Sequence, residues 1–562
     1  MAATRRHVLR GMTAALVCSR AHGSDFSPAY NPVVPLPKTN QIGFLPHDTK
    51  RFAWTVGDGA ATNLPFAVHR VDGGSTFRAF TGRAIDQRAT AGEFVAVGDF
   101  SMLREPGTYR VVVDGVASHP FVISEAVYQP LLRDAVRAFH LIRANTAQDD
   151  PVTKVRHAAG HLSEAALLVD GEKRDLTGGW YNAGDFGKWV HMAALATSHM
   201  MWLYELCPQA ACALKLNVPS TRKLPDLLAE ARWGLDWMLK MQNADGSVLH
   251  KVDAEPALPW GVLPADDKTE RRAKPAGSWD AAVFTAAMVQ AARVYKAFDP
   301  VFAARCRGAA RKAWTWLEAH PGVENHDPYY AGSAIAPKVL WALGEMAGLD
   351  PALSEQAAQA FTQDTVPSLS WMTPQILGVL ALARGKPGRV RDLAIGKIAA
   401  AADVVMAASA SDAYGYDGNP KVYYWGSVEN ALNGANACFL AYVLGAGAKY
   451  RDGGTRLIDY VLGHNALGHT FVTGHGTRRV EHPWHWIYRD EGIAIPGWAT
   501  GGPNCYPEGA DVPLKNLIAL QPPPAKSYLD LCEVGSWASN EGQTSENAAL
   551  LLAVGLRAAA RA

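Results

Sequence analysis

The sequence predicts two domains, an N-terminal β-sandwich followed by a helical barrel. Its 562 residues exceed what one ordinary hydrophobic core contains. Residues from about 30 to 124 carry short apolar runs separated by Gly, Pro and Asp turns, whereas apolar residues from Tyr128 onward recur with the 3.6-residue period of helices. With 48% apolar and 19% charged residues and no low-complexity tract, the composition is that of a folded globular protein.

Residues 1–24 are predicted to be an export signal. The pair Arg5-Arg6 precedes a short, mildly apolar run from Gly11 to Val17, an arrangement that resembles a twin-arginine signal. We therefore expect cleavage near Gly23 and a periplasmic or extracellular location. A basic, unstructured tail is the alternative, because the apolar run is short.

Residues 30–124 are predicted to form the sandwich. Several short runs rich in Val, Phe and Tyr are bounded by turn residues, and strands at this spacing are typical of two packed sheets. A Pro-Gly turn precedes the last of the clearest runs. These runs are 51–56, 94–97 and 108–113.

Residues 125–562 are predicted to form the helical domain. About a dozen helices are too many for a plain bundle, so we expect nested hairpins that close into a double-layered barrel. Non-helical stretches at 145–187, 243–277 and 465–539 are too long to be simple connectors, and we expect them to build a binding face. The expected helices are one after Gly187 and those at 130–144, 225–241, 278–298, 301–320, 330–346, 373–384, 390–408, 428–444, 453–463 and 540–557.

Charge and the lengths of the apolar runs argue against two classes of partner. The net charge is +1, from 54 basic and 53 acidic residues, which gives no electrostatic basis for binding nucleic acid or an anionic membrane. No segment approaches the roughly 18 uninterrupted apolar residues of a transmembrane helix, so we expect no membrane span. The 17 Trp and 18 Tyr supply core packing, and some of them suit stacking against the apolar faces of sugar rings.

Two kinds of site based on cysteine or histidine are not expected. The seven cysteines are scattered without a CxxC pair, which argues against a disulfide framework or a zinc ribbon, although a Cys207–Cys212 bridge stays open. His482 and His485 have metal-like spacing but lack a helix to align them and a clear third ligand, so we expect no metal there. Lining of a sugar cleft and plain loop packing are the two interpretations that remain for these histidines.

Two acidic residues stand out in loops that precede helices. Asp185 lies in the segment 178–188 (GGWYNAGDFGK) and Glu541 in the segment 536–548 (SWASNEGQTSENA). Each is locally explained by a structural role, Asp185 as a helix N-cap and Glu541 as a carboxylate that stabilises the N-terminus of the last helix. A catalytic role is the alternative for both. Glu546, five positions later, is expected at the surface.

Together these segments resemble glycoside hydrolase family 9, which contains cellulases. The segment 178–188 is similar to the family motif GGWYDAGDYGK, and 536–548 resembles a C-terminal motif in which Trp537 replaces a Tyr and Glu541 matches the Glu. The segment 40–46 (NQIGFLP) resembles the start of the immunoglobulin-like domain that precedes many members. Shorter matches occur in the family's order at 250–252, 425–427 with Asn433, 470–474 and 501–504.

The resemblance implies an (α/α)6 barrel after an immunoglobulin-like sandwich, and inverting hydrolysis of β-1,4-glucan. In that reaction an acid protonates the leaving oxygen while a base activates water, with the two carboxyl groups roughly 6.5–9.5 Å apart. Glu541 corresponds to the acid, Asp185 to the base, and Asn182 to a residue that helps to hold the water. No cofactor is required, and the family allows a structural calcium. The residues expected to bind substrate are Trp180, Tyr181, Trp425, His482, Trp484, His485, Trp486 and Trp537.

The chain departs from the family pattern at the predicted site. The family's first Asp is Asn182 here, so we expect a less activated water and less like-charge repulsion on the pKa of Asp185. Trp484 and Trp486 replace a His and an Arg that contact sugar hydroxyls, which favours ring stacking over ionic hydrogen bonds. A general acid needs a raised pKa, and we expect aromatic neighbours such as Trp537 to desolvate Glu541.

These departures leave the substrate open. The leading hypothesis is an endo-acting β-1,4-glucanase. An exo-acting enzyme that releases single glucose or glucosamine units from oligosaccharides is the second, and an inactive carbohydrate-binding protein is the third. The retention of both principal carboxylates favours an enzyme.

Overall fold

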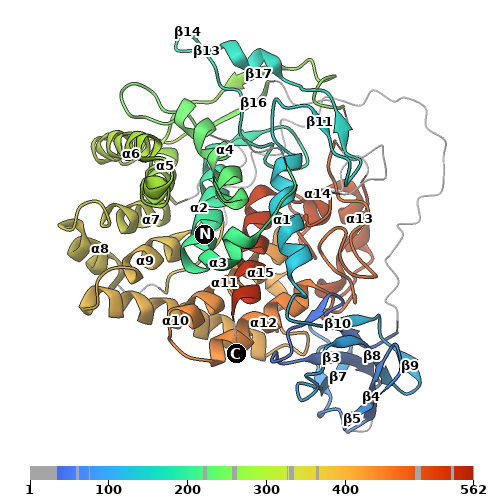
Figure 1. Cartoon of the computed structure of the whole chain (residues 1–562). Helices are drawn as coiled ribbons and strands as arrows, with labels where there is room; N and C mark the ends of the chain where they lie inside the picture. The colour runs from blue at the N-terminus through green and yellow to red at the C-terminus, as the bar shows by residue number, and fades with distance from the viewer. Residues whose placement is uncertain are drawn as a thin grey trace.

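The structure is a computed structural model of the whole chain (Figure 1). The residues it describes are 35–58, 63–74, 76–218, 224–255, 262–325, 327, 334–362, 366–487, 495–532 and 537–560. The predicted export signal, residues 1–24, lies outside this part of the chain.

The N-terminal domain is a sandwich of two sheets, as predicted. One sheet has the strand order β1-β3-β7-β6 and the other β2-β10-β8-β4-β5, with β9 added beside β8. All pairs are antiparallel except β2 with β10. The strands are β1 (Lys38–Thr39), β2 (Gly43–Phe44), β3 (Arg51–Val56), β4 (Pro65–Arg70), β5 (Thr76–Phe80), β6 (Ile85–Asp86), β7 (Phe94–Asp99), β8 (Gly107–Val113), β9 (Val116–Ala117) and β10 (Phe121–Ile123).

Alternation of side chains along the strands builds the sandwich core. In β8, Tyr109, Val111 and Val113 are buried while Arg110 faces outward, as the two-residue period of a strand requires. The Phe44 ring meets Phe100 and Phe121 edge-on, with ring centroids 5.6 Å apart in both pairs. The apolar runs recognised in the sequence are therefore strands because each buries one face.

The second domain is a helical barrel, also as predicted (Figure 1). Its helices pack in a closed circuit from α15 through α2, α5, α7, α9, α10 and α11 back to α15. The helices are α1 (Gln129–Leu141), α2 (Val190–Leu206), α3 (Pro208–Ala213), α4 (Asp226–Lys240), α5 (Ser278–Val294), α6 (Pro300–Ala319), α7 (Ala336–Met346), α8 (Leu353–Thr362), α9 (Gln375–Ala383), α10 (Arg389–Ala410), α11 (Ser427–Val443), α12 (Lys449–Val461), α13 (Val512–Ala519), α14 (Trp537–Asn540) and α15 (Thr544–Ala559).

Burial separates the inner helices of the barrel from the outer ones. Nearly every residue of α2, α5, α11 and α15 is buried, because these helices are apolar or small on all sides. In contrast α1 and α12 are strongly amphipathic and cover the barrel from outside. The inner helices carry the loops that form the candidate site at their N-terminal ends.

The loops of the barrel contain strands that the sequence analysis did not predict. They form the hairpins β11–β12 and β13–β14 and a three-stranded sheet β15-β16-β17. These strands are too short for their periodicity to be visible in the sequence. They are β11 (Gln148–Asp149), β12 (Arg156–His157), β13 (Leu167–Val169), β14 (Glu172–Arg174), β15 (Lys188–Trp189), β16 (Lys251–Glu255) and β17 (Glu270–Ala273).

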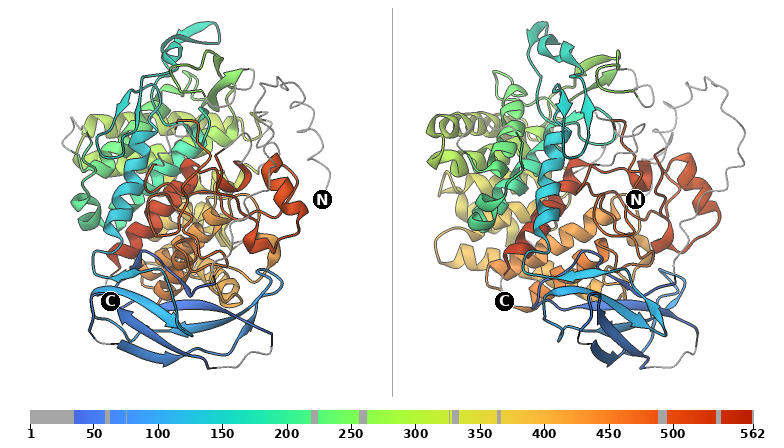
Figure 2. Two further views of the ribbon diagram at one scale, coloured as in Figure 1. Left: turned by 90° about the vertical axis from the view of Figure 1, so that its right-hand side faces the viewer. Right: turned by 45° about the vertical axis from the view of Figure 1, so that its right-hand side comes forward.

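The sandwich lies against one end of the helical domain (Figure 2), and polar contacts join the two. Asn40 Nδ2 donates to Asp459 Oδ1 at 2.8 Å, and Gln41 Nε2 donates to the carbonyl of Gly468 at 2.9 Å. Lys38 Nζ donates to the Tyr414 hydroxyl at 2.9 Å. The segment that resembles the start of the family's immunoglobulin-like domain therefore contacts the barrel directly.

Among the described helices, α10 alone is long and apolar enough to cross a membrane, with a mean hydropathy of 1.6 over 18 residues. It packs against α9, α11 and α12 within the barrel, which accounts for the apolar residues on that side. None of the six cysteines in the described residues forms a disulfide, so Cys207 and Cys212 are not bridged.

Candidate active site

Asp185 lies on the loop between Gly178 and Lys188, not at the N-cap of a helix. Its Oδ1 accepts a hydrogen bond from the Gly187 amide at 3.1 Å, and α2 begins only at Val190 after the short strand β15. The local prediction of an N-cap is therefore wrong: the carboxylate stabilises a tight turn instead.

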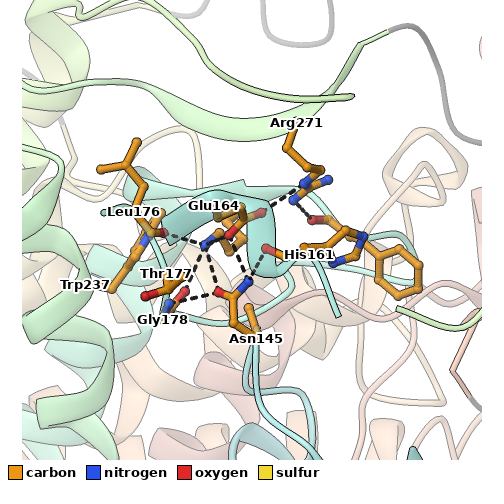
Figure 3. A network of polar contacts seen from close by, with 12 residues as sticks. Asn145, His161, Glu164, Leu176, Thr177, Gly178, Trp237 and Arg271 are labelled. Atoms are coloured by element: carbon orange, nitrogen blue, oxygen red, sulfur yellow. Dashed lines mark hydrogen bonds and ion pairs between the residues drawn. The ribbon is translucent and has the colours of Figure 1, made fainter. Parts of the chain in front are cut away.

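A buried ion-pair cluster anchors this loop from behind (Figure 3). The Glu164 carboxylate accepts from Arg271 Nε at 2.9 Å and forms an ion pair with Lys188. Arg271 also donates to the Phe186 carbonyl at 2.6 Å, and Lys188 donates to the Leu176 carbonyl at 2.8 Å. Burial opposes ionisation of Glu164, but Lys188 and Arg271 outweigh it and lower the pKa of this carboxyl.

Glu541 comes to the same loop from the opposite end of the chain. It follows α14 and precedes α15, and its Oε1 accepts a hydrogen bond from the Gly184 amide at 3.1 Å. The last helix begins at Thr544, later than predicted, because Gln543 and Glu546 form its capping box. Glu541 is thus a linker residue whose carboxyl lies beside the Asp185 loop.

An aromatic segment packs between the two carboxylate-bearing stretches. Trp484 N donates to the Asn540 carbonyl at 3.0 Å, and Trp486 N donates to the Gly184 carbonyl at 2.9 Å. A Cβ atom on Gly184 would lie 2.3 Å from Cε3 of Trp484, so only glycine allows this approach. The Trp484 ring lies 5.9 Å from that of Trp486 and 6.0 Å from that of Trp537.

Burial and neighbouring carboxylates raise the pKa values of both Asp185 and Glu541. Glu541 is 6% exposed, and its burial, followed by repulsion from Asp185, raises its pKa well above the ordinary value. Burial also raises the pKa of Asp185 to about 6, with repulsion from Asp253 as the next cause. Both shifts have the direction that general acid–base chemistry near neutral pH requires.

Two of the predicted substrate-binding tryptophans lie near the carboxyls or remain accessible. Trp537 is half-buried against Trp484. Trp425 is 37% exposed and directly precedes Gly426, whose Cβ position lies 3.8 Å from Oε1 of Glu546. His482 is exposed, and its backbone carbonyl accepts from Asn540 Nδ2 at 2.5 Å, one residue before Glu541.

Three other predicted substrate-binding residues belong to the core instead. Trp180 is buried between helices and donates from Nε1 to Glu230 at 2.9 Å. The Tyr181 hydroxyl lies 2.7 Å from Nδ1 of the buried His161. His485 is buried with its ring 6.1 Å from that of Trp498, and burial lowers its pKa to about 3. These side chains are covered by protein, so we no longer expect them to contact a sugar.

Asn182, the predicted water-holding residue, is bound to the start of the last helix. Its Oδ1 accepts from the Thr544 hydroxyl at 2.6 Å, and its carbonyl accepts from the Thr544 amide at 2.8 Å. The amide side chain is buried in this contact.

Three acidic residues at the site were missed or misplaced by sequence reasoning. Glu546 is buried rather than at the surface. Glu429, near the start of α11, accepts hydrogen bonds from the Trp371 amide at 3.2 Å and the Ser545 hydroxyl at 3.1 Å, and burial raises its pKa to about 7. Asp253 follows the matched segment 250–252 by one residue, and that proximity was the available signal.

The described residues contain no group of three or more His, Cys, Asp or Glu side chains arranged to hold a metal ion. We therefore assign no ligands to the structural calcium that the resemblance allows.

Comparison with known proteins agrees with this geometry. Residues 128–554 match the glycosyl hydrolase family 9 model, and residues 38–118 match that of the cellulase N-terminal ig-like domain. The chain is 30% identical to Endoglucanase C of Cellulomonas fimi over 93% of its own length and 52% of that protein, so it spans about half of this relative.

Two further similarities cover nearly the whole of both chains. The xyloglucan-specific endo-beta-1,4-glucanase of Bacteroides ovatus is 29% identical, with 92% of each chain aligned. The crystal structure of the family 9 endoglucanase J30 superposes with a TM-score of 0.85 at 28% identity, covering 92% of this chain and 99% of that one. Both domains of the present chain therefore have counterparts in one solved protein.

Proposed function

Because this chain belongs to glycosyl hydrolase family 9 and is an endoglucanase-like glycoside hydrolase with an (α/α)6 barrel, we propose that it cleaves β-1,4-glucan within the chain and with inversion. In this proposal Glu541 is the general acid and Asp185 is the general base. The observation that carries the assignment is the meeting of the half-buried Asp185 and the buried Glu541, 356 positions apart in sequence, at Gly184.

The acid step uses the neutral form of Glu541. Burial and the nearby Asp185 charge keep this carboxyl protonated, so it can donate its proton to the leaving glycosidic oxygen. The Gly184 amide holds the carboxyl in position through Oε1. As the bond to the leaving sugar breaks, the resulting Glu541 carboxylate retains that hydrogen bond.

The base step uses the ionised form of Asp185. A water molecule on the opposite face of the sugar gives one proton to Asp185 as its oxygen bonds to the anomeric carbon. A carboxyl with a pKa of about 6 is largely ionised at neutral pH and is a stronger base than an ordinary aspartate. Attack from the face opposite the leaving group converts a β linkage into an α product.

The aromatic side chains support a substrate of stacked sugar rings. Trp484 pairs with Glu541 through the backbone and packs against Trp486 and Trp537, while Trp425 is 37% exposed. Indoles of this kind bury the apolar faces of sugars favourably. We propose that Trp484 and Trp486 stack on or border the sugar that is cleaved. His482 is an accessible candidate for hydrogen bonds to hydroxyls.

The test combines product and viscosity assays. The wild-type protein is incubated with soluble cellulose, xyloglucan, xylan, chitosan and cello-oligosaccharides, and reducing ends, viscosity and anomers (by NMR) are followed. We expect a rapid fall in the viscosity of a β-1,4-glucan and initial α-anomer release. Initial β-anomer, or no hydrolysis of any β-1,4-glucan, would contradict the proposal.

An exo-acting enzyme on oligosaccharides is the second candidate, and the aromatic packing supports it. Trp484 and Trp486 are largely buried against the Asp185 loop, so the space beside the carboxyls is walled by indoles where the family usually has a His and an Arg. Release of a monosaccharide before any change in viscosity would favour this candidate.

We also propose export by a twin-arginine signal in residues 1–24, as the sequence predicts. Export would bring the enzyme to a polymeric substrate outside the cell. Replacement of Arg5 and Arg6 by Lys should retain the protein in the cytoplasm, which fractionation of the producing cells measures.

A further inference from the structure

We propose that Asp253 supplies the second carboxylate at the catalytic water, taking the role that the family's first aspartate fills and that Asn182 occupies in this sequence. The inference rests on the proposed function, because it assigns a positioning residue to the same reaction. It extends that function to a residue on a different strand of the site.

Strand register brings Asp253 to the Asp185 loop. In the β15–β16 pair, Lys188 lies opposite Val252 and Trp189 opposite Lys251, so Asp253 follows in register opposite Gly187. Opposed residues on antiparallel strands have Cβ atoms about 5 Å apart. A Cβ atom on Gly187 would lie 2.9 Å from Nε1 of Trp189, 3.5 Å from Oδ1 of Asp185 and 3.5 Å from Oδ1 of Asp253. The two carboxylates and the Trp189 indole nitrogen therefore converge beside Gly187.

The side chain of Asn182 is already hydrogen-bonded to the start of the last helix. Its Oδ1 accepts the Thr544 hydroxyl at 2.6 Å, so this oxygen binds the first residue of α15. An amide also lacks the charge that would strengthen a hydrogen bond from the reacting water. The side chain in the family's first aspartate position is thus an unsuitable acceptor, while a charged acceptor stands on the neighbouring strand.

A cation supports Asp253 from the other side. Lys251 Nζ lies 2.8 Å from Oδ2 of Asp253 and 2.8 Å from Oδ2 of Asp327. Burial would lower the pKa of Lys251, but the two aspartates outweigh it and raise that pKa, so the ammonium stays charged. Its pairing with Oδ2 leaves Oδ1, which accepts a hydrogen bond from the Ala254 amide at 2.8 Å, on the side of Asp185.

Asp185 and Glu541 transfer the protons in this reaction, and Asp253 only orients the water. The water gives one proton to Asp185 and its oxygen to the anomeric carbon, while Glu541 gives its proton to the leaving oxygen. The second hydrogen of the water points to Asp253 Oδ1, which accepts a hydrogen bond and takes no proton. Asp253 thereby orients the lone pair of the water toward the sugar.

The test uses Asp253→Asn, with the exposed Glu270→Gln on the adjacent strand β17 as the matched control for loss of one negative charge. We expect Asp253→Asn to lower kcat roughly 10- to 100-fold with KM within about twofold, which is less than the roughly 10²- to 10⁴-fold effect of a group that itself transfers the proton. Glu270→Gln should retain kcat. Unchanged kcat in Asp253→Asn would overturn the proposal.

The pH profile separates a role at the water from a structural role. The charged groups that act on Asp185 are Asp253 and Lys251 from β16 and Arg271 from β17, while Glu541 faces it across the site. Removing the Asp253 charge should move the acid limb of kcat/KM to lower pH, because repulsion no longer favours protonation of Asp185. A lower kcat with an unmoved acid limb would assign Asp253 to the fold alone.

Placing an aspartate at position 182 should restore activity that is lost in Asp253→Asn. The double variant Asn182→Asp with Asp253→Asn should recover at least tenfold of the lost kcat, whereas Asn182→Asp alone should change kcat less than about twofold, because the role is already filled. A gain above tenfold in Asn182→Asp alone would overturn the proposal, and it can be measured even if Asp253→Asn does not fold.

Hydrolysis by the wild type and by Asp185→Asn is measured before the Asp253 variants are compared. Initial α-anomer release by the wild type, lost in Asp185→Asn, establishes inverting hydrolysis independently of Asp253. A wild type without hydrolysis would overturn both proposals, whereas an active wild type with an unaffected Asp253→Asn overturns this one alone.

Discussion

The two sides of the loop from Gly178 to Lys188 place buried carboxyls in opposite electrostatic environments. Behind the loop, Glu164 is fully buried beside Lys188 and Arg271, and these cations lower its pKa despite burial (Figure 3). In front of it, Glu541 is also buried, but its carboxyl accepts a hydrogen bond from the neutral Gly184 amide, and burial and repulsion from Asp185 raise its pKa well above the ordinary value.

The difference shows how one loop serves both stability and chemistry. A buried carboxylate with two cations orders the backbone around it, because the charges compensate one another. A buried carboxyl without a cation costs free energy when ionised, and that cost is what makes it a proton donor at neutral pH. Arg271 links the two sides, since it binds Glu164 and the Phe186 carbonyl next to Asp185.

Replacement of Glu541, in front of the loop, should have the largest effect on the reaction. Glu541→Gln is expected to lower kcat on cellulose by roughly 10²- to 10⁴-fold, because the leaving oxygen loses its proton donor. Unfolding should change little, since a neutral amide replaces a carboxyl that is itself protonated. Steady-state kinetics and thermal denaturation measure both.

A leaving-group control sharpens this prediction. An aryl β-cellobioside with an acidic phenol needs little protonation, so Glu541→Gln should retain far more activity on it than on cellulose. Equal losses on both substrates would show that Glu541 is not the acid.

Replacement of Glu164, behind the loop, should instead lower the stability of the fold. Glu164→Gln leaves Lys188 and Arg271 buried without their shared counter-ion, and the free energy of unfolding should fall by roughly 3–5 kcal/mol. The exposed Glu172→Gln on the nearby hairpin is the matched control and should change it by less than about 0.5 kcal/mol. Denaturant unfolding measures both; similar values for the two variants would remove the contrast between the sides of the loop.

The pH dependence of the reaction tests the ionisation of Asp185 and Glu541 without any substitution. Asp185 must be ionised, and its pKa of about 6 predicts that kcat/KM falls about tenfold per pH unit below pH 6. At higher pH the rate should hold until Glu541 loses its proton. Rates between pH 4 and pH 9 on a soluble β-glucan measure this, and a limb near pH 4 would indicate a solvated, ordinary aspartate.

A smaller effect is expected at Glu429, which resembles Glu541 in accepting hydrogen bonds from neutral donors: the Trp371 amide, the Ser545 hydroxyl and the Asn433 side-chain amide. Its pKa is raised to about 7 by burial, so its neutral form stabilises the fold fully below about pH 4.5, and this stabilisation is lost as pH rises through 7. Glu429→Gln should therefore reduce the loss of stability between pH 5 and pH 8 by roughly 2 kcal/mol.

Denaturant unfolding at both pH values measures this change, and Glu318→Gln, at an exposed position on α6, is the control. An identical pH dependence in wild type and Glu429→Gln would mean that Glu429 is hydrated in solution.

Much of the architecture follows from local sequence patterns. The runs at 51–56 and 108–113 are strands because alternate residues face one core, and 225–241 is a helix because its apolar residues share one face. Motif matches also pointed to Asp185 and Glu541, whose roles remain a proposal. The strand and helix predictions succeed because periodicity is a property of neighbouring residues.

Other features depend on segments that are distant in sequence. Trp180 and Tyr181 were expected at the sugar but are covered by helices and by His161. Glu546 was expected at the surface but is buried in the capping box of α15. A residue's neighbours along the chain do not show what packs over it.

The sequence by itself determined the two domains, the family and the two carboxyls proposed for the reaction. The tertiary structure decided what surrounds the acidic side chains: two cations for Glu164, the Gly184 amide and Asp185 for Glu541, and Asp253 for Asp185. The physical reason is that a pKa depends on desolvation and on charges within a few ångströms, and both are set by strand register and by packing between segments hundreds of residues apart.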